Sequence, residues 1–269
     1  MLGYRGSSLD RDEPGAVPVS GDHVWAASEF SSGTMLGMAE EITIDQALES
    51  FLDEQRERLS AGTMHSYEQV VELLRHSLNG YAPNTLDEGE HKRWTRAFEA
   101  GDEDAFCHLF GPEHILGNVS EFLGYFMIHK VMAGQELLRS AGTVIKKLAT
   151  WLYERHYVSD EERGIAVERG TDAARDLPRA ERLAALLYDQ SRHTPAFDPE
   201  DHGAADFVED YLMIDRVEPG ALYFAGGIGP VVVPEKACAL AEVGWEVNIS
   251  LVRLDGTWRV IEVGNVYPM

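Results

Sequence analysis

The sequence predicts an α+β protein with an all-helical N-terminal part and a small β-barrel at its C-terminal end. Apolar residues recur at helical spacing through residues 38–158, whereas they alternate with polar residues over 207–269. Between them, residues 159–206 hold 12 acidic and 6 basic residues and one amphipathic stretch. We therefore predict a helical domain over 38–158, an acidic, partly helical connector over 159–206, and a barrel domain over 207–269.

Residues 1–37 differ from the rest of the chain. They are rich in Gly, Ser and Pro, and no apolar period runs through them. We expect either a disordered tail or an extension that precedes the true start of the protein at Met38.

The composition is strongly acidic. The chain has 23 Lys and Arg residues against 46 Asp and Glu residues, a net charge of −23, which repels nucleic acids and anionic membranes at long range. We interpret this charge as a solubility feature or an adaptation to a salty cytoplasm. Two cysteines form no disulfide framework, and neither a signal peptide nor an apolar run of about 18 to 20 residues is present. The sequence thus predicts a soluble cytoplasmic protein without a membrane partner.

Capping signals and breaks mark the helices of the first part. Thr43 and Gln46 have the spacing of a capping box at the start of the first helix. A second helix is predicted to be capped by Thr63 and to end near Asn79 and Gly80. Shorter helices are expected over residues 86–100, 102–110 and 115–132, with a break at Gly111 and Pro112.

The stretch 137–158 has the clearest two-sided pattern in the chain. Its apolar face consists of Leu137, Ala141, Val144, Ile145, Leu148 and Leu152. The opposite face carries Arg139, Thr143, Lys146 and Thr150, with Lys147 beside them. In an acidic chain, this gathering of positive charge is the best lead to a function.

Turn signals divide the C-terminal part into short strands. Strands are predicted over 211–217, 221–224, 231–233, 245–251 and 258–263, with one or two helical turns within 235–243. Asp255 and Gly256 form a hairpin turn signal. Short strands over about 60 residues suit a barrel of SH3 or OB type.

Two segments carry a resemblance to a known family. They are FLDEQRERLSAGTMHSYEQVVELLRHSL (51–78), with Thr63 four residues before Tyr67, and TVIKKLATWLYERHYV (143–158), with its Trp-Leu pair. Residues 42–158 resemble the N-terminal SAM-like, core-binding domain of phage integrases and other tyrosine recombinases, with an extra segment near 86–112. A winged helix-turn-helix is an alternative for LATWLYERHYV.

The resemblance implies a domain that clamps DNA through its phosphate backbone. The residues of this chain that match such a role are Arg139, Thr143, Lys146, Lys147, His65 and Ser66. Lysine and arginine neutralise phosphates, and hydroxyl groups can donate hydrogen bonds to them. The alternatives are that this face is simply solvated or that it contacts a protein.

The chain lacks the residues with which tyrosine recombinases cleave DNA strands. None of the ten histidines is followed by Arg at the third position, and the recombinase set of Arg, Lys, His and Tyr side chains is missing. We therefore predict a non-catalytic DNA-associated accessory or regulatory protein, with duplex DNA as its partner. The open alternatives are an acidic protein-interaction adaptor and an enzyme of unknown class.

Other candidate sites have simpler explanations. The glycines at 226–229 lack the Lys-Ser/Thr of a phosphate loop and are interpreted as a turn. Cys107, His108 and His114 lack a fourth ligand, so no metal or cofactor is expected. In the barrel, Trp245, Trp258 and Tyr223 are candidate stacking surfaces for an oligonucleotide, or else they fill the core.

Overall fold

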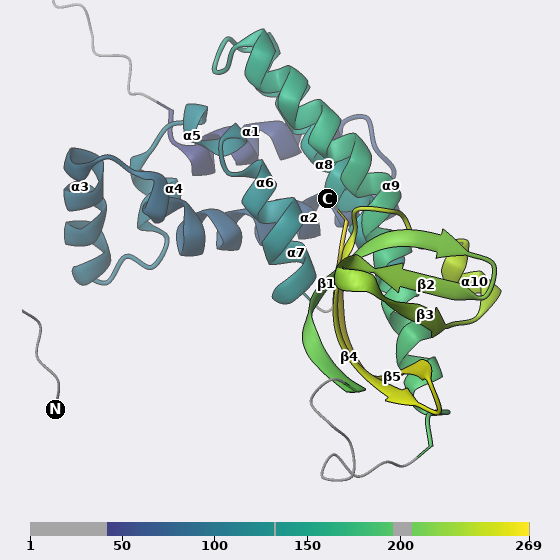
Figure 1. Ribbon diagram of the computed structural model, residues 1–269. Helices are drawn as coiled ribbons and strands as arrows, with labels where there is room; N and C mark the ends of the chain where they lie inside the picture. The colour runs from purple at the N-terminus through teal and green to yellow at the C-terminus, as the bar shows by residue number, and fades with distance from the viewer. Residues whose placement is uncertain (1–41, 132, 196–205, 269) are drawn as a thin grey trace, which may run out of the picture. The chain divides into compact units, whose positions relative to one another are not determined.

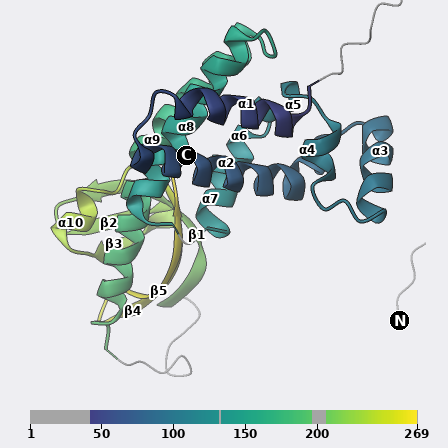
Figure 2. The same ribbon diagram turned by 180° about the vertical axis from the view of Figure 1, so that it is seen from behind.

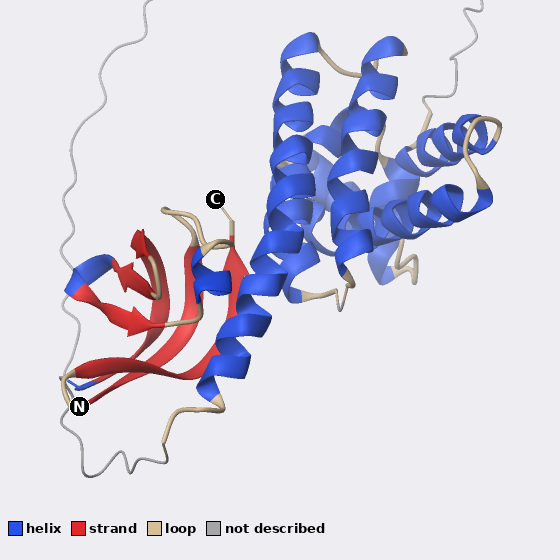
Figure 3. Cartoon of the chain, turned by 90° about the vertical axis from the view of Figure 1, so that its right-hand side faces the viewer, coloured by secondary structure: helices blue, strands red, loops and turns tan. Residues whose placement is uncertain are grey.

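The computed structural model describes residues 42–131, 133–195 and 206–268 (Figure 1). The extension over 1–37 and the proposed start at Met38 lie outside the described residues. Helices come first and strands follow, so the α+β prediction is confirmed as a helical N-terminal part and a C-terminal five-stranded sheet (Figure 3). The helices of the first part are α1 (Ile44–Arg56), α2 (Ala61–Tyr81), α3 (Glu88–Glu99), α4 (Ala105–Leu109), α5 (Glu113–Leu116), α6 (Val119–Glu121), α7 (Met127–His129) and α8 (Gln135–Glu154).

The starts of α1 and α2 test the capping predictions. At α1, Thr43 accepts a hydrogen bond from the backbone of Gln46, and the Gln46 side chain accepts one from the Thr43 backbone, so the capping box is confirmed. At α2 the prediction was wrong, because Ser60 is the N-cap and its hydroxyl accepts from the backbone N–H of Thr63 at 3.4 Å. Serine is as good a cap as threonine, and it lies where the helix can begin one turn earlier.

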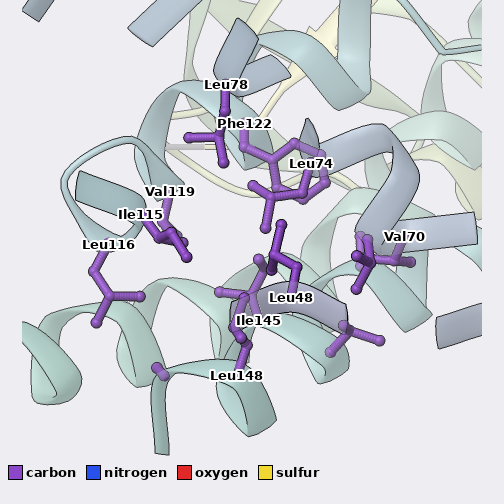
Figure 4. Packing of buried hydrophobic residues seen from close by; sticks show 14 of the residues in the cluster. Leu48, Val70, Leu74, Leu78, Ile115, Leu116, Val119, Phe122, Ile145 and Leu148 are labelled. Atoms are coloured by element: carbon purple, nitrogen blue, oxygen red, sulfur yellow. The ribbon is translucent and has the colours of Figure 1, made fainter. Parts of the chain in front are cut away.

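A single apolar core holds the helical part together. Figure 4 shows Leu48 of α1, Leu74 of α2, and Ile145 and Leu148 of α8 gathered in one cluster with Phe122. All five side chains are fully buried. The predicted apolar face of the stretch 137–158 is therefore the face that packs into this core.

The segment predicted as one helix over 115–132 is broken into shorter pieces. After α5 and α6, a π-helical turn (Phe122–Phe126) leads into α7, and the backbone N–H of Met127 bonds to the Phe122 carbonyl. The glycines at 117 and 124 weaken a continuous α-helix here. This irregular path turns Phe122 and Phe126 inward and leaves Tyr125 exposed.

Most of the predicted connector is one long helix, α9 (Asp160–Ser191), which runs through Pro178 without a break (Figure 2). Its first half belongs to the helical core through Ala166, Ala173 and Leu177. Its second half belongs to a separate core within the sheet, through Ala180, Leu183 and Leu187. Proline usually ends a helix, but burial on both sides of Pro178 outweighs the one lost backbone hydrogen bond.

The C-terminal strands form a sheet that closes on itself in the order β1-β2-β3-β5-β4. The strands are β1 (Phe207–Glu218), β2 (Ala221–Phe224), β3 (Ile228–Val232), β4 (Glu246–Leu254) and β5 (Thr257–Tyr267), and a short helix α10 (Glu235–Cys238) joins β3 to β4. β1 pairs with both β2 and β4, and among the strands that the structure describes only β3 and β5 pair in parallel.

The hairpin between β4 and β5 forms at the predicted turn. Asp255 and Gly256 both have positive φ, of 50° and 77°, as a two-residue turn of the primed type requires. Within the described residues, no helix has both the length and the apolar character needed to cross a bilayer.

Candidate nucleic-acid interface

The polar face of α8 lies where the sequence pattern places it, in three successive turns of one helix. Arg139 and Lys147 are exposed, and Thr143, Lys146 and Thr150 are half-buried. The Thr143 hydroxyl donates to the Arg139 carbonyl at 3.1 Å, and the Thr150 hydroxyl donates to the Lys146 carbonyl at 3.0 Å. These hydroxyls can still accept, but their protons are already used within the helix.

Helix α9 covers one side of this face, which the sequence pattern did not indicate. A Cβ atom built on Gly142 would lie 2.3 Å from the Gly170 carbonyl oxygen. A Cβ on Gly170 would lie 2.8 Å from Cγ of Lys146, so the lysine stem lies against the α9 backbone. Long cationic side chains commonly bury their stems in this way. Arg139 and Lys147 are therefore the most accessible cations of the face.

The cations of α8 differ from those of α9 in their ion pairing among the described residues. Within the described residues, neither Arg139, Lys146 nor Lys147 takes part in an ion pair. On α9, several carboxylates are matched by arginines of the same helix, as in the pairs Arg163–Asp160 at 2.5 Å and Arg175–Asp172 at 3.2 Å.

The two candidates on α2 lie apart from the first turns of α8. His65 is exposed and Ser66 is half-buried, and both lie in the second turn of α2. The neighbouring Tyr67 stacks on Phe51, with ring centres 6.1 Å apart. Phe51 in turn contacts Trp151 near the C-terminal end of α8. Arg139 occupies the opposite end of that 20-residue helix. The predicted set of six residues is thus split between two places.

The tryptophans proposed for base stacking point into the sheet core. Trp245 is 3% exposed and Trp258 is 8% exposed, so neither leaves a ring face for a base. Tyr223 is half-buried, with the Arg216 guanidinium 3.7 Å from its ring centre, and its hydroxyl donates to Glu218 at 2.8 Å. Trp245 and Trp258 are therefore unavailable for base stacking because they are buried. The alternation of apolar and polar residues predicts a strand, but it does not tell which aromatic rings the closed sheet will enclose.

A pocket of about 600 Å³ lies where α7, α8, α9 and β5 meet, and sequence reasoning missed it. Its polar lining residues are His129, Lys130, Glu181 and Asn265. Only folding brings these positions together, since His129 and Asn265 are far apart in the chain. No short motif in the sequence signals such a site.

His129 is held in one tautomer beside this pocket. Its Nδ1 lies 3.0 Å from the Tyr125 carbonyl, so Nδ1 carries the proton and donates. Its Nε2, 2.8 Å from the Tyr267 hydroxyl, therefore accepts from that phenol. Burial raises the pKa of Tyr267, which keeps the phenol protonated as a donor.

The cysteine and histidines of α4 and α5 do not form a metal site. His108 lies 3.0 Å from the Asp102 carboxylate, whereas His114 faces Glu90 at 3.5 Å. Cys107 is buried, and burial raises the pKa of its thiol to about 12. In the described part of the chain, no group of three or more His, Cys, Asp and Glu side chains is arranged to hold an ion.

Comparisons with known proteins gave no relative: no protein-family model, curated protein or solved structure matches this chain.

Proposed function

We propose that this is a non-catalytic DNA-associated protein, with an accessory or regulatory role, in which α8 contacts the phosphate backbone of duplex DNA. The observation that carries the proposal is the set of Arg139, Lys146 and Lys147 on α8, with Arg139 about two turns before the two lysines. Within the described residues, these three cations have no ion-pair partner. The segment 115–158 has five basic and three acidic residues, against a net charge of −23 for the chain. The resemblance of residues 42–158 to the DNA-clamping domain of integrases supports the same role.

The sheet is proposed to be a small barrel of the OB rather than the SH3 type. Support comes from its strand order, in which the third and fifth strands run parallel and a short helix joins the third strand to the fourth. We place the protein in the cytoplasm, because Cys107 and Cys238 are both free thiols.

The test is binding to a short duplex at two salt concentrations. Three phosphate contacts predict a slope of log K against log salt of about −2.7, which is about a 40-fold loss of affinity between about 50 and 200 mM salt. We expect Lys146→Glu with Lys147→Glu to abolish the binding measured by fluorescence anisotropy. The proposal fails if the wild-type protein does not bind at low salt, or if this variant binds equally well.

Two further variants separate a local effect from charge and from folding. Arg96→Glu with Arg192→Glu makes the same change in net charge at exposed positions, on α3 and at the end of α9, and is expected to keep the binding. Arg139→Gln with Lys147→Gln changes exposed positions alone and is expected to reduce the slope to about −0.9.

A further inference from the structure

The protein repeatedly places an arginine between an aromatic ring and a carboxylate. Arg155 lies 4.0 Å from the Trp151 ring centre and pairs with Glu54. Arg179 lies 5.0 Å from the Trp245 ring centre and pairs with Glu242 at 2.7 Å. The same arrangement occurs in Arg163 with Tyr153 and Asp160, Arg216 with Tyr223 and Glu218, and Arg253 with Trp258 and Asp206.

One surface of the sheet has the rings and the carboxylates of this arrangement, but no arginine of the described part of the chain lies between them. On β1, Tyr211 is 53% exposed and Met213 is 41% exposed, because they alternate with the inward-facing Leu212 and Ile214. Glu209 lies two residues before Tyr211 on the same face. Glu246 of β4 stands opposite both Met213 of β1 and Tyr267 of β5. We call Glu209, Tyr211, Met213, Glu246 and Tyr267 the β1 face.

The aromatic surface continues from the sheet onto the helical part. Tyr211 and Tyr267 have ring centres 5.6 Å apart, and Tyr267 lies 5.1 Å from His129. His129 in turn lies 4.1 Å from Tyr125, which is itself 36% exposed. Tyr125 already has a cation, because the Lys130 ammonium lies 5.9 Å from its ring centre. The exposed ring of Tyr211 therefore offers the accessible face for a further flat or cationic group.

The carboxylates of the β1 face have no cationic partner within residues 42–131, 133–195 and 206–268. In the described residues, neither Glu209 nor Glu246 takes part in an ion pair or a side-chain hydrogen bond. Negative charge beside exposed rings disfavours a phosphate-bearing ligand and favours a cation. Among cations, guanidinium both stacks on an aromatic face and forms paired hydrogen bonds to a carboxylate.

We propose that the β1 face is a docking site for an extended, arginine-bearing segment of a partner protein. The partner's arginine supplies the missing cation, stacked on Tyr211 or Tyr267 and paired with Glu209 or Glu246. This interaction goes beyond the proposed DNA contact, because it uses a different surface and the opposite charge.

The probe is a short fluorescein-labelled peptide in which arginine alternates with glycine and serine, compared with the same peptide carrying glutamine in place of arginine. Fluorescence anisotropy at about 100 mM salt should show binding of the arginine peptide alone. Glu209→Gln with Glu246→Gln, and separately Tyr211→Ala, should each weaken that binding about tenfold. Both variants change surface side chains, so the fold should be kept.

Matched controls are needed because any cationic peptide is attracted to an acidic protein. Glu161→Gln with Glu168→Gln removes the same charge from exposed positions on α9, and Tyr188→Ala removes a tyrosine that is 56% exposed. Both controls should bind the peptide as the wild type does. An equal loss in these controls, or no binding by the wild type, would overturn the proposal.

Two other occupants are distinguished by the same variants. Binding of a labelled oligothymidine that Tyr211→Ala abolishes would assign the β1 face to single-stranded nucleic acid instead. Concentration-dependent self-association that is lost in Glu209→Gln with Glu246→Gln would assign it to a second copy of the chain. Either result would refute a partner's arginine segment.

Discussion

The two halves of α9, before and after Pro178, pack by opposite means. Where the first half contacts α8, both helices have a glycine, and Gly170 meets Gly142 of α8 so closely that either Cβ would lie within 2.7 Å of a backbone atom. In the second half, Leu183 and Leu187 fill the core of the closed sheet and are fully buried. The contact of the first half with α8 requires residues without side chains, whereas the contact of the second half with the sheet requires large apolar side chains. Added atoms should therefore disrupt the first, and removed atoms the second.

The largest effect is expected from Leu183→Ala in the sheet half of α9. Loss of a fully buried leucine leaves a cavity and should lower the free energy of unfolding by about 3 kcal/mol. Urea denaturation followed by far-UV circular dichroism measures the change. Leu186 is a half-buried leucine on the same half of α9, and Leu186→Ala should lower the free energy of unfolding by only about 1 kcal/mol. Similar losses for the two variants would contradict the proposed role of volume here.

Gly142→Ala tests the other half by adding a single methyl group. The new Cβ would meet the Gly170 carbonyl at 2.3 Å and the Ala174 backbone nitrogen at 2.5 Å, so α8 and α9 must separate. We expect a loss of about 2 kcal/mol in the same denaturation experiment. Gly164→Ala is the control, because no atom lies near its Cβ position. It should raise stability by up to about 1 kcal/mol, through helix propensity alone.

Ser159→Ala removes the cap of α9 and should have a smaller effect, about 1 kcal/mol near neutral pH. The Ser159 hydroxyl and backbone bond to Glu162 and lower the pKa of that carboxyl. A lowered folded-state pKa means that the contribution is present above the unfolded-state value of about 4.3 and is lost as the pH falls through the folded value. The difference between wild type and variant should therefore shrink on acidification. A difference that grows in acid would contradict this mechanism.

The two cysteines report on the two cores without any substitution. Cys107 is buried in the helical core and its pKa is raised to about 12, whereas Cys238 is partly exposed beside the sheet. In a thiol-labelling experiment near pH 8, we expect Cys238 to react and Cys107 to stay protected until urea opens the helical core. If α9 couples the two cores, Leu183→Ala should speed labelling of Cys107. An unchanged rate would show that the cores open independently.

The sequence predicts most elements because local signals control them. The capping box at Thr43 and the turn at Asp255 and Gly256 match the structure, and the alternation along β4 holds over residues 246–249, whereas Ser250 is buried. Where prediction fails, tertiary packing overrides a local rule. The acidic composition of residues 159–206 predicted a partly helical connector, yet one helix continues through Pro178 because both of its halves are buried in separate cores.

The candidate site was predictable only in part. The cations of α8 follow from helical spacing, but the cover that α9 gives to Lys146 depends on the Gly142–Gly170 contact between two helices. The burial of Trp245 and Trp258 depends on closure of the sheet, which alternation alone does not encode. The His129–Tyr267 bond joins positions that no local pattern relates.

Because α9 belongs to both the helical core and the sheet core, it also affects the order in which the two cores fold. α8 and α9 are neighbours along the chain, whereas β1 must find β4 across two intervening strands. Closing the longer loop costs more entropy and is slower, so we expect the α8–α9 hairpin to form first. Until the sheet closes, Leu183 and Leu187 would stay exposed to solvent. We therefore expect refolding chains to aggregate through this transient apolar surface at high protein concentration.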